Sequence, residues 1–253
     1  MEIKRLDPSN SPVTYVRAVA AGGLMYFTDH VARPEYVTVR EQLTAITARY
    51  MELFARFHLR KEDIVYALIY LNEPYSWQEI EPIWEGWMRG IEARMALIPS
   101  RFHNGRDMAV TLIVAGDERA AAAARADTAW EETVRGFHAV GTPPGTGYAE
   151  HSGVAYLTRV VCAGGRPIRE QTSAILAEAD RAFAERGLRK ENLIFQFSYV
   201  ADRPGVDIDA YEEEWQRWIG PGTLNPPSGV RMQLDMPAGH DVEITFLVAI
   251  NGK

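Results

Sequence analysis

The feature that most constrains this chain is an internal repeat. Residues 40–71 align without a gap on residues 169–200, at an offset of 129, and thirteen of the 32 aligned positions are identical. The likeness resumes at an offset of 131, where WEGW at residues 84–87 matches WQRW at residues 215–218. Because a duplication of this length sets the domain count, we predict two copies of one domain of about 110 residues each.

The segment between the copies has a different composition from both. Five consecutive alanines, residues 120–124, favour a helix, whereas Gly136 and the Pro-Pro-Gly run at residues 143–145 break one. We therefore predict a first copy over residues 1–116, a helical linker over residues 117–145 and a second copy over residues 146–253.

Apolar periodicity predicts the elements of each copy. In the first copy we expect a hairpin around Gly22 and Gly23, a helix over residues 39–57, a strand over 64–71, a helix over 76–90 and a last hairpin turning at Asn104–Gly105. The second helix carries a stripe of Trp side chains, which we expect to pack in the core or in a contact between subunits. The order β-β-α-β-α-β-β is that of an α+β domain, in which a mixed sheet carries two helices on one face.

Charge and composition exclude several classes of partner. The chain has 27 Lys and Arg against 34 Asp and Glu, a net charge of -7, which disfavours nucleic acid and anionic membranes. The amino terminus lacks an apolar signal segment and there is no run of 18 apolar residues, so we expect a cytoplasmic protein. Cys162 is the single cysteine, which excludes an internal disulfide.

The six histidines do not have the spacing of metal ligands. Neither H-x-H nor H-x-x-x-H occurs, so we predict no metal site. His30 has two interpretations: an acid or base near neutral pH, or a hydrogen-bonded structural residue at a strand end.

Four motifs, taken together, resemble the Rid family, the YjgF-type reactive intermediate deaminases. Its opening Tyr and Ser-Gly-Gln-Val motif are similar to Tyr15 and to residues 28–31, Thr-Asp-His-Val. Its first helix is similar to the segments that begin at Glu41-Gln42 and Glu170-Gln171, and its central strand is preceded by a segment similar to residues 59–65 and 188–194. Its ending is similar to residues 236–239, Met-Pro-Ala-Gly, followed by Val-Glu-Ile at residues 242–244.

The resemblance implies both a fold and a chemistry. It implies two tandem Rid/chorismate-mutase-like domains, assembly as a three-bladed ring with clefts between blades, and hydrolysis of 2-imino or 2-enamino acids without a cofactor. In such a cleft an Arg holds the substrate carboxylate, a Glu positions and deprotonates a water, and main-chain donors with a Tyr hydroxyl close the pocket. Two blades in one chain imply a homo-oligomer, most simply a trimer of chains.

The resemblance assigns the site residues unevenly to the two copies. Glu243 stands at the position of the family's catalytic Glu in the second copy, but Ser228 stands where the family has its Arg. In the first copy Arg94 or, alternatively, Arg101 binds the substrate carboxylate, and the acid position falls on Ala109 or Thr111.

Two interpretations of this split stay open. We expect one composite cleft, in which Tyr15, Thr28, His30 and a cation of the first copy bind a small carboxylate metabolite beside Glu243. The alternative is that both sites have diverged and that Arg94 and Glu243 are ordinary charges at strand ends.

Two other functions remain alternatives to an imine deaminase. One is a lyase, cyclase or hydrolase of secondary metabolism that acts on a larger cyclic carboxylic acid, as in the chorismatases. The other is a Rid homologue that binds a metabolite without turnover.

Overall fold

The structure is a computed structural model that describes residues 3–8, 16–30, 32, 35–102, 106–136, 147–162, 164–220, 228–233, 236 and 239–250. Its contacts divide the chain into two compact units, one of residues 23–128 and one of residues 1–22 with 129–253. The first 22 residues thus group with the second copy, and the other division falls inside the predicted linker, after residue 128. Each unit is described by itself below.

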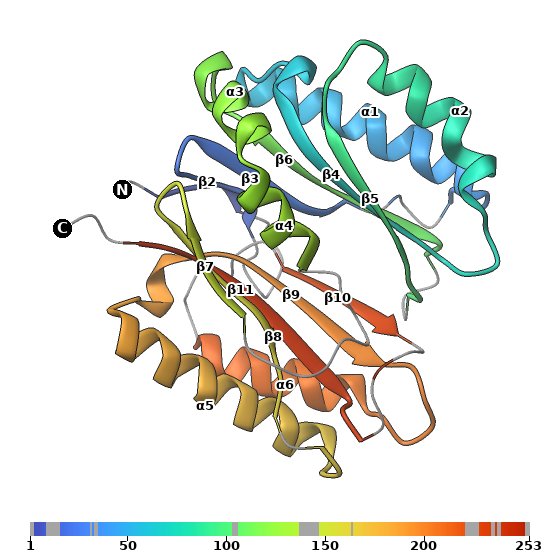
Figure 1. The fold of residues 1–253 in the computed structure, drawn as a ribbon. Helices are drawn as coiled ribbons and strands as arrows, with labels where there is room; N and C mark the ends of the chain where they lie inside the picture. The colour runs from blue at the N-terminus through green and yellow to red at the C-terminus, as the bar shows by residue number, and fades with distance from the viewer. Residues whose placement is uncertain are drawn as a thin grey trace. The chain divides into compact units, whose positions relative to one another are not determined.

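The unit of residues 23–128 contains four strands of one mixed sheet, in the order β3-β6-β4-β5. Figure 1 shows α1 and α2 together on one face of these strands. In chain order its elements are β3 (Leu24–His30), α1 (Val39–Phe57), the short helix η1 (Lys61–Asp63), β4 (Ile64–Leu71), α2 (Trp77–Met88), β5 (Arg94–Pro99), β6 (Met108–Ala115) and α3 (Glu118–Ala126).

The second unit contains a five-stranded sheet in the order β10-β9-β11-β8-β7, with α5 and α6 on one face (Figure 1). Its elements are β1 (Lys4–Pro8), β2 (Val16–Ala21), α4 (Thr128–Gly136), β7 (Gly147–His151), β8 (Val154–Val160), α5 (Ile168–Arg186), η2 (Lys190–Asn192), β9 (Leu193–Ala201), α6 (Ile208–Ile219), β10 (Ser228–Gln233) and β11 (Val242–Ala249).

The second copy has the predicted order β-β-α-β-α-β-β, and the first copy has this order with one additional strand, β1, at its start, so the α+β fold class is confirmed. Individual contacts repeat as well: Lys61 donates its ammonium to the carbonyl of Trp87, and Lys190 donates to that of Trp218 over 2.7 Å. The first long helix of each copy ends on a left-handed residue at the aligned position, His58 (φ 56°) or Gly187 (φ 65°). The duplication therefore extends from sequence to side-chain contacts.

Capping and turn residues predicted two of the observed elements correctly. The helix over residues 39–57 begins at a capping box, in which Thr38 accepts from the Glu41 amide and the Glu41 carboxylate accepts from the Thr38 amide. The predicted first hairpin turns at Gly22 and Gly23, whose φ values of 61° and 78° suit a tight turn between two strands.

The predicted hairpin at Asn104–Gly105 is wrong. β5 and β6 do not pair with each other; both pair with β4, β5 in parallel and β6 antiparallel. A parallel neighbour needs a crossover, and α2 supplies it between β4 and β5. Residues 104 and 105 themselves lie outside the described residues.

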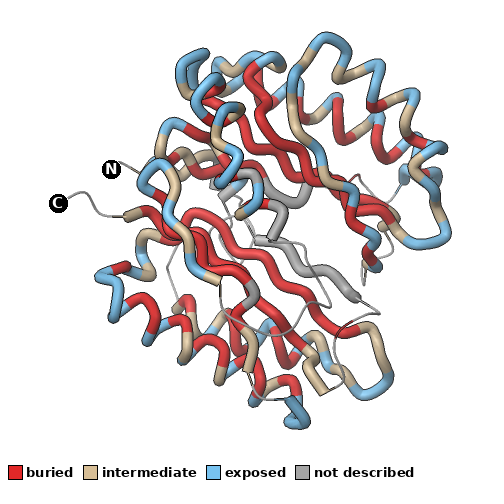
Figure 2. The backbone as a smooth tube through the Cα atoms, viewed as in Figure 1, coloured by how far each residue is buried: buried red, intermediate tan, exposed pale blue. Residues whose placement is uncertain are grey.

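The cores lie between helices and sheets. Every residue of β4, β6, β9 and β11 is buried, as the unbroken red of these strands in Figure 2 shows. In the first copy Ile80 and Trp84 of the predicted Trp stripe are buried, and Trp84 packs on Trp87 with ring centroids 5.4 Å apart. Within the described residues, no helix combines the length and apolarity needed to cross a bilayer.

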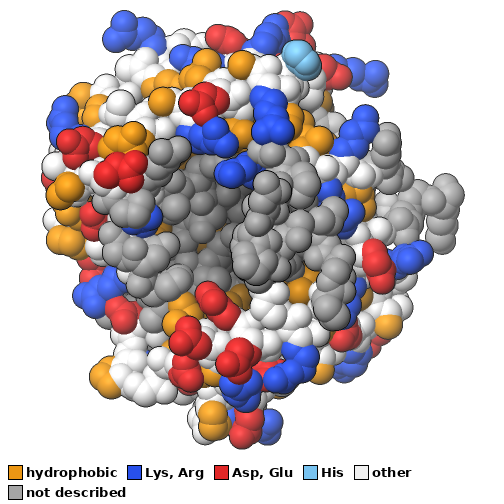
Figure 3. Space-filling model, turned by 180° about the vertical axis from the view of Figure 1, so that it is seen from behind, with side chains coloured by type: hydrophobic (Ala, Val, Ile, Leu, Met, Phe, Trp, Pro, Cys, Tyr) orange, Lys and Arg blue, Asp and Glu red, His pale blue; other side chains and the backbone are white. Residues whose placement is uncertain are grey.

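Charged side chains of both signs lie on the face shown in Figure 3. One carboxylate, that of Glu214 on α6, is only 5% exposed. Its carboxylate accepts from Arg169 (2.9 Å), Ser173 (2.8 Å) and Arg217 (2.5 Å), and so joins α6 to α5. Burial alone would raise the pKa of Glu214, but these hydrogen bonds lower it below its ordinary value.

Candidate functional site

Glu243 lies on the face of the second sheet that is opposite α5 and α6. Along β11 the alternate residues Val242, Ile244 and Phe246 pack into the core with those helices, so the pleat turns Glu243 to the other face. There it is directly opposite Tyr199 of β9 and is only 6% exposed. A carboxylate rarely occupies such a position, which makes Glu243 the first candidate for chemistry.

The strand register decides between the two acid positions left open in the first copy. Tyr70 aligns with Tyr199, and the residue opposite Tyr70 is Ala109, whereas Thr111 is opposite Leu68. Ala109 therefore occupies the position of Glu243. Only the second copy carries the acid.

A buried glutamine holds the start of β11 in place. Gln171 of α5 donates from Nε2 to Oδ2 of Asp241 (2.6 Å) and accepts the Asp241 amide on Oε1 (2.9 Å). Arg203 adds an ion pair to the same carboxylate, with Nε 2.9 Å from Oδ1. Because Asp241 is two residues before Glu243, this clamp anchors the backbone that leads into Glu243.

The first copy has the same clamp. Gln42 donates to Oδ2 of Asp107 over 3.0 Å and accepts its amide over 3.1 Å. The family motif drew attention to Gln42 and Gln171, but sequence reasoning missed both aspartates, which are 65 and 70 residues further along the chain. Neither aspartate has a sequence signal of its own.

The two candidate cations have different surroundings. Arg94 is the first residue of β5, and its guanidinium donates to the carbonyls of Arg125 (2.7 Å) and Asp127 (3.4 Å) at the end of α3. A cation is favourable there because helix carbonyls are unpaired at that end. Arg101 is exposed and pairs with Glu73 at 3.3 Å.

The remaining predicted site residues are described in part or not at all. Tyr15 lies outside the described residues. Thr28 and His30 belong to β3, and only their backbones are described. Arg94 and Glu243 belong to different units, so the composite cleft stays a prediction.

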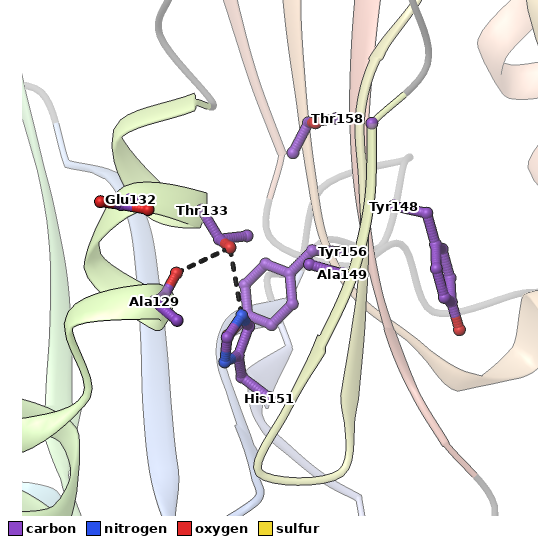
Figure 4. A pocket seen from close by; sticks show the side chains of 9 residues that line it. Ala129, Glu132, Thr133, Tyr148, Ala149, His151, Tyr156 and Thr158 are labelled. Carbon is purple, nitrogen blue, oxygen red and sulfur yellow. Dashed lines mark hydrogen bonds between the residues drawn. The ribbon is translucent and has the colours of Figure 1, made fainter.

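A groove of about 430 Å³ lies between α4 and the β7–β8 hairpin, and sequence reasoning missed it. It is lined by Ala129, Glu132, Thr133, Gly147, Tyr148, Ala149, His151, Tyr156 and Thr158 (Figure 4). Thr158 is the fifth residue of β8, as Thr28 is of β3, an equivalence that the strand bounds of the structure give.

The described residues offer little to hold a metal. Nowhere among them do three His, Cys, Asp or Glu side chains converge as a candidate ligand set. Cys162 is half-buried, and burial raises the pKa of its thiol, so the thiolate is disfavoured. What the described part can do chemically is general acid–base work at Glu243 and hydrogen bonding in the groove.

Comparison with known proteins gives a likeness in structure alone. No protein-family model matches the sequence, and neither does any curated protein. A YjgF-family protein from Neisseria meningitidis is 20% identical and covers 47% of this chain and 98% of its own, with a TM-score of 0.42. A member of the same family from Mycobacterium tuberculosis is 17% identical and covers 45% of this chain and 99% of its own, with a TM-score of 0.39. A Rid-family protein of unknown function from Yersinia pestis is 13% identical and covers 45% of this chain and 99% of its own, with a TM-score of 0.40. Solved structures of YjgF and Rid proteins are thus similar to somewhat less than half of this chain over nearly their own full length.

Proposed function

We propose that the chain is a cofactor-free hydrolase that removes the nitrogen of an imine or enamine from a small carboxylate substrate. The observation that carries the proposal is the buried carboxylate of Glu243 on the sheet face opposite the helices, in a strand whose start is anchored by the Gln171–Asp241 clamp. The family resemblance assigns this residue the role of general base, and its burial suits a carboxylate that exchanges a proton with substrate and water.

The chemistry needs one carboxylate and one water. Glu243 takes a proton from water while the water oxygen bonds to the carbon of the C=N group, whose π electrons move to nitrogen. Glu243 returns this proton to nitrogen, which gives the neutral carbinolamine. Glu243 then takes the hydroxyl proton and passes it to nitrogen, the C–N bond breaks as the C=O bond forms, and ammonia leaves the ketone. No electron acceptor is required, because the carbon keeps its oxidation state.

A cation is needed to hold the substrate carboxylate. We propose Arg94, with Arg101 as its competitor, and we propose that Tyr15, Thr28 and His30 contact the substrate. Separate Arg94→Ala and Arg101→Ala variants decide between the cations. The variant that lacks the carboxylate-binding arginine should have a KM about tenfold or more above that of the wild type, because a charge-assisted bidentate contact is lost.

The activity is tested by generating imines in place. An amino acid oxidase supplies the 2-imino acid, and semicarbazide traps what has not been hydrolysed. We expect the purified protein to lower semicarbazone formation in proportion to its concentration. If it does not, the proposal is wrong, and a rise in melting temperature with a 2-keto acid would then favour a binding protein without turnover.

A further inference from the structure

The groove between α4 and the β7–β8 hairpin is hollow because its walls carry small residues. Ala129 on α4 and Gly147 and Ala149 on β7 line it together. Its volume of about 430 Å³ lies within the range of small-molecule sites. Larger side chains at these three positions would fill it.

Hydrogen bonds fix one polar wall. The Thr133 hydroxyl donates its single proton to the Ala129 carbonyl (3.0 Å), so it must accept from Nε2 of His151, 3.1 Å away. The dashed lines in Figure 4 mark both contacts. Thr133 and His151 are therefore oriented before any ligand enters, which lowers the entropy cost of binding.

An aromatic residue forms the adjoining wall. The Tyr156 ring meets His151 edge to face, with centroids 5.8 Å apart and planes at 75°. Its hydroxyl accepts from Nε1 of the buried Trp130 over 2.8 Å. This contact ties α4 to β8 and holds the ring in place.

Gly147 keeps a second hydroxyl in the lining. A Cβ at this position would lie 2.4 Å from Oγ1 of Thr158, so any other residue would displace that hydroxyl. The groove thus combines two threonine hydroxyls, an imidazole and a phenol ring.

The charge of the lining indicates the class of ligand. Among the described lining residues, Glu132 alone carries a permanent charge; it is exposed, and Figure 4 shows it pointing away from Thr133 and His151. An ion buried beside hydroxyls would lose hydration without a counter-charge. We propose that this groove binds a small, uncharged, planar molecule with hydrogen-bonding groups, of the aromatic carboxamide class. The proposal uses none of the residues around Glu243 and does not depend on the proposed hydrolase.

Three probes with one ring and different charge test the class of ligand: benzamide, benzoate and benzylamine. Calorimetry on the full chain should show benzamide binding at least about tenfold more tightly than either ion. Thr133→Val keeps the shape of the side chain but removes the hydroxyl, and should lower the affinity for benzamide about fivefold. Ala149→Phe fills the hollow and should abolish binding.

The controls separate this site from the rest of the molecule. Gly86→Ala, on an exposed helical position with open space around it, should leave benzamide affinity unchanged, and so should Glu243→Gln. Failure to bind benzamide would overturn the proposal. So would equal or tighter binding of benzoate or benzylamine that persists in a protein with both Arg94→Ala and Arg101→Ala, in which the proposed substrate site no longer binds a carboxylate. So would unchanged affinity in Thr133→Val, which decides the matter even if Ala149→Phe does not fold.

Discussion

The duplicated glutamine clamp allows a matched perturbation inside one molecule. Gln171→Leu and Gln42→Leu remove equivalent amides from equivalent buried positions. We predict that both variants lose similar stability, but that only Gln171→Leu loses activity. The reason is that β11 carries Glu243, whereas β6 has Ala109 at the same register.

The loss of stability follows from the bonds broken. Gln171→Leu removes both bonds to Asp241 and a third to the Arg166 carbonyl (2.7 Å). A buried amide left without its acceptor costs about 1–3 kcal/mol, and the added apolar burial returns about 1 kcal/mol. Since Asp241 keeps its ion pair with Arg203, the net loss should be about 1 kcal/mol. Gln42→Leu should cost about the same, because Asp107 keeps a 3.1 Å bond from Asn72.

Urea denaturation measures the stability, and the semicarbazide assay measures turnover below the unfolding range. We expect Gln171→Leu to lower kcat about tenfold or more, because misplacing a general base by about 1 Å is costly. Gln42→Leu should keep the wild-type kcat. Equal loss of activity in both variants, or none in Gln171→Leu, would refute the positioning role of the clamp.

Three further predictions concern stability and assembly. Glu214→Gln should lower the free energy of unfolding by about 1–3 kcal/mol above about pH 5. Because folding lowers the pKa of Glu214 below 4.5, the difference in unfolding free energy between this variant and the wild type should shrink as the pH falls further. A difference that stays constant to about pH 2 would contradict this prediction. Gly22→Ala should lower the free energy of unfolding, measured with urea, by more than about 1 kcal/mol, since φ is 61° and a Cβ would lie 2.4 Å from the Ser152 carbonyl oxygen. Gly86→Ala should instead raise this free energy by about 0.5 kcal/mol. Equal effects of the two substitutions would refute this prediction. Light scattering should give a mass three times the 28.4 kDa chain if the predicted trimer forms, and a monomer would exclude it.

Sequence reasoning succeeded where the signals were local. The helix over residues 39–57 and the strand over 64–71 have the predicted bounds, because capping residues and an unbroken apolar run mark their ends. The turn residues Asn104–Gly105 suggested a hairpin, but a turn signal does not say which strands pair. β1 was missed altogether, since its sequence, KRLDP, has little of the apolar alternation of a strand.

The candidate site was harder to predict because it depends on distant pairs. Glu243 was identified through the motif around it, and its burial agrees with a special role. The clamp and the groove depend on partners far apart in sequence, such as Gln171 with Asp241 and Trp130 with Tyr156. Such pairs have no periodicity to reveal them.

The measurement that most directly tests the account is the rate of imine hydrolysis by Glu243→Gln. Glutamine keeps the shape of the side chain but cannot accept the proton of water, so kcat should fall about 100-fold or more while the melting temperature stays near that of the wild type. A folded Glu243→Gln protein that hydrolyses imines at the wild-type rate would contradict the account.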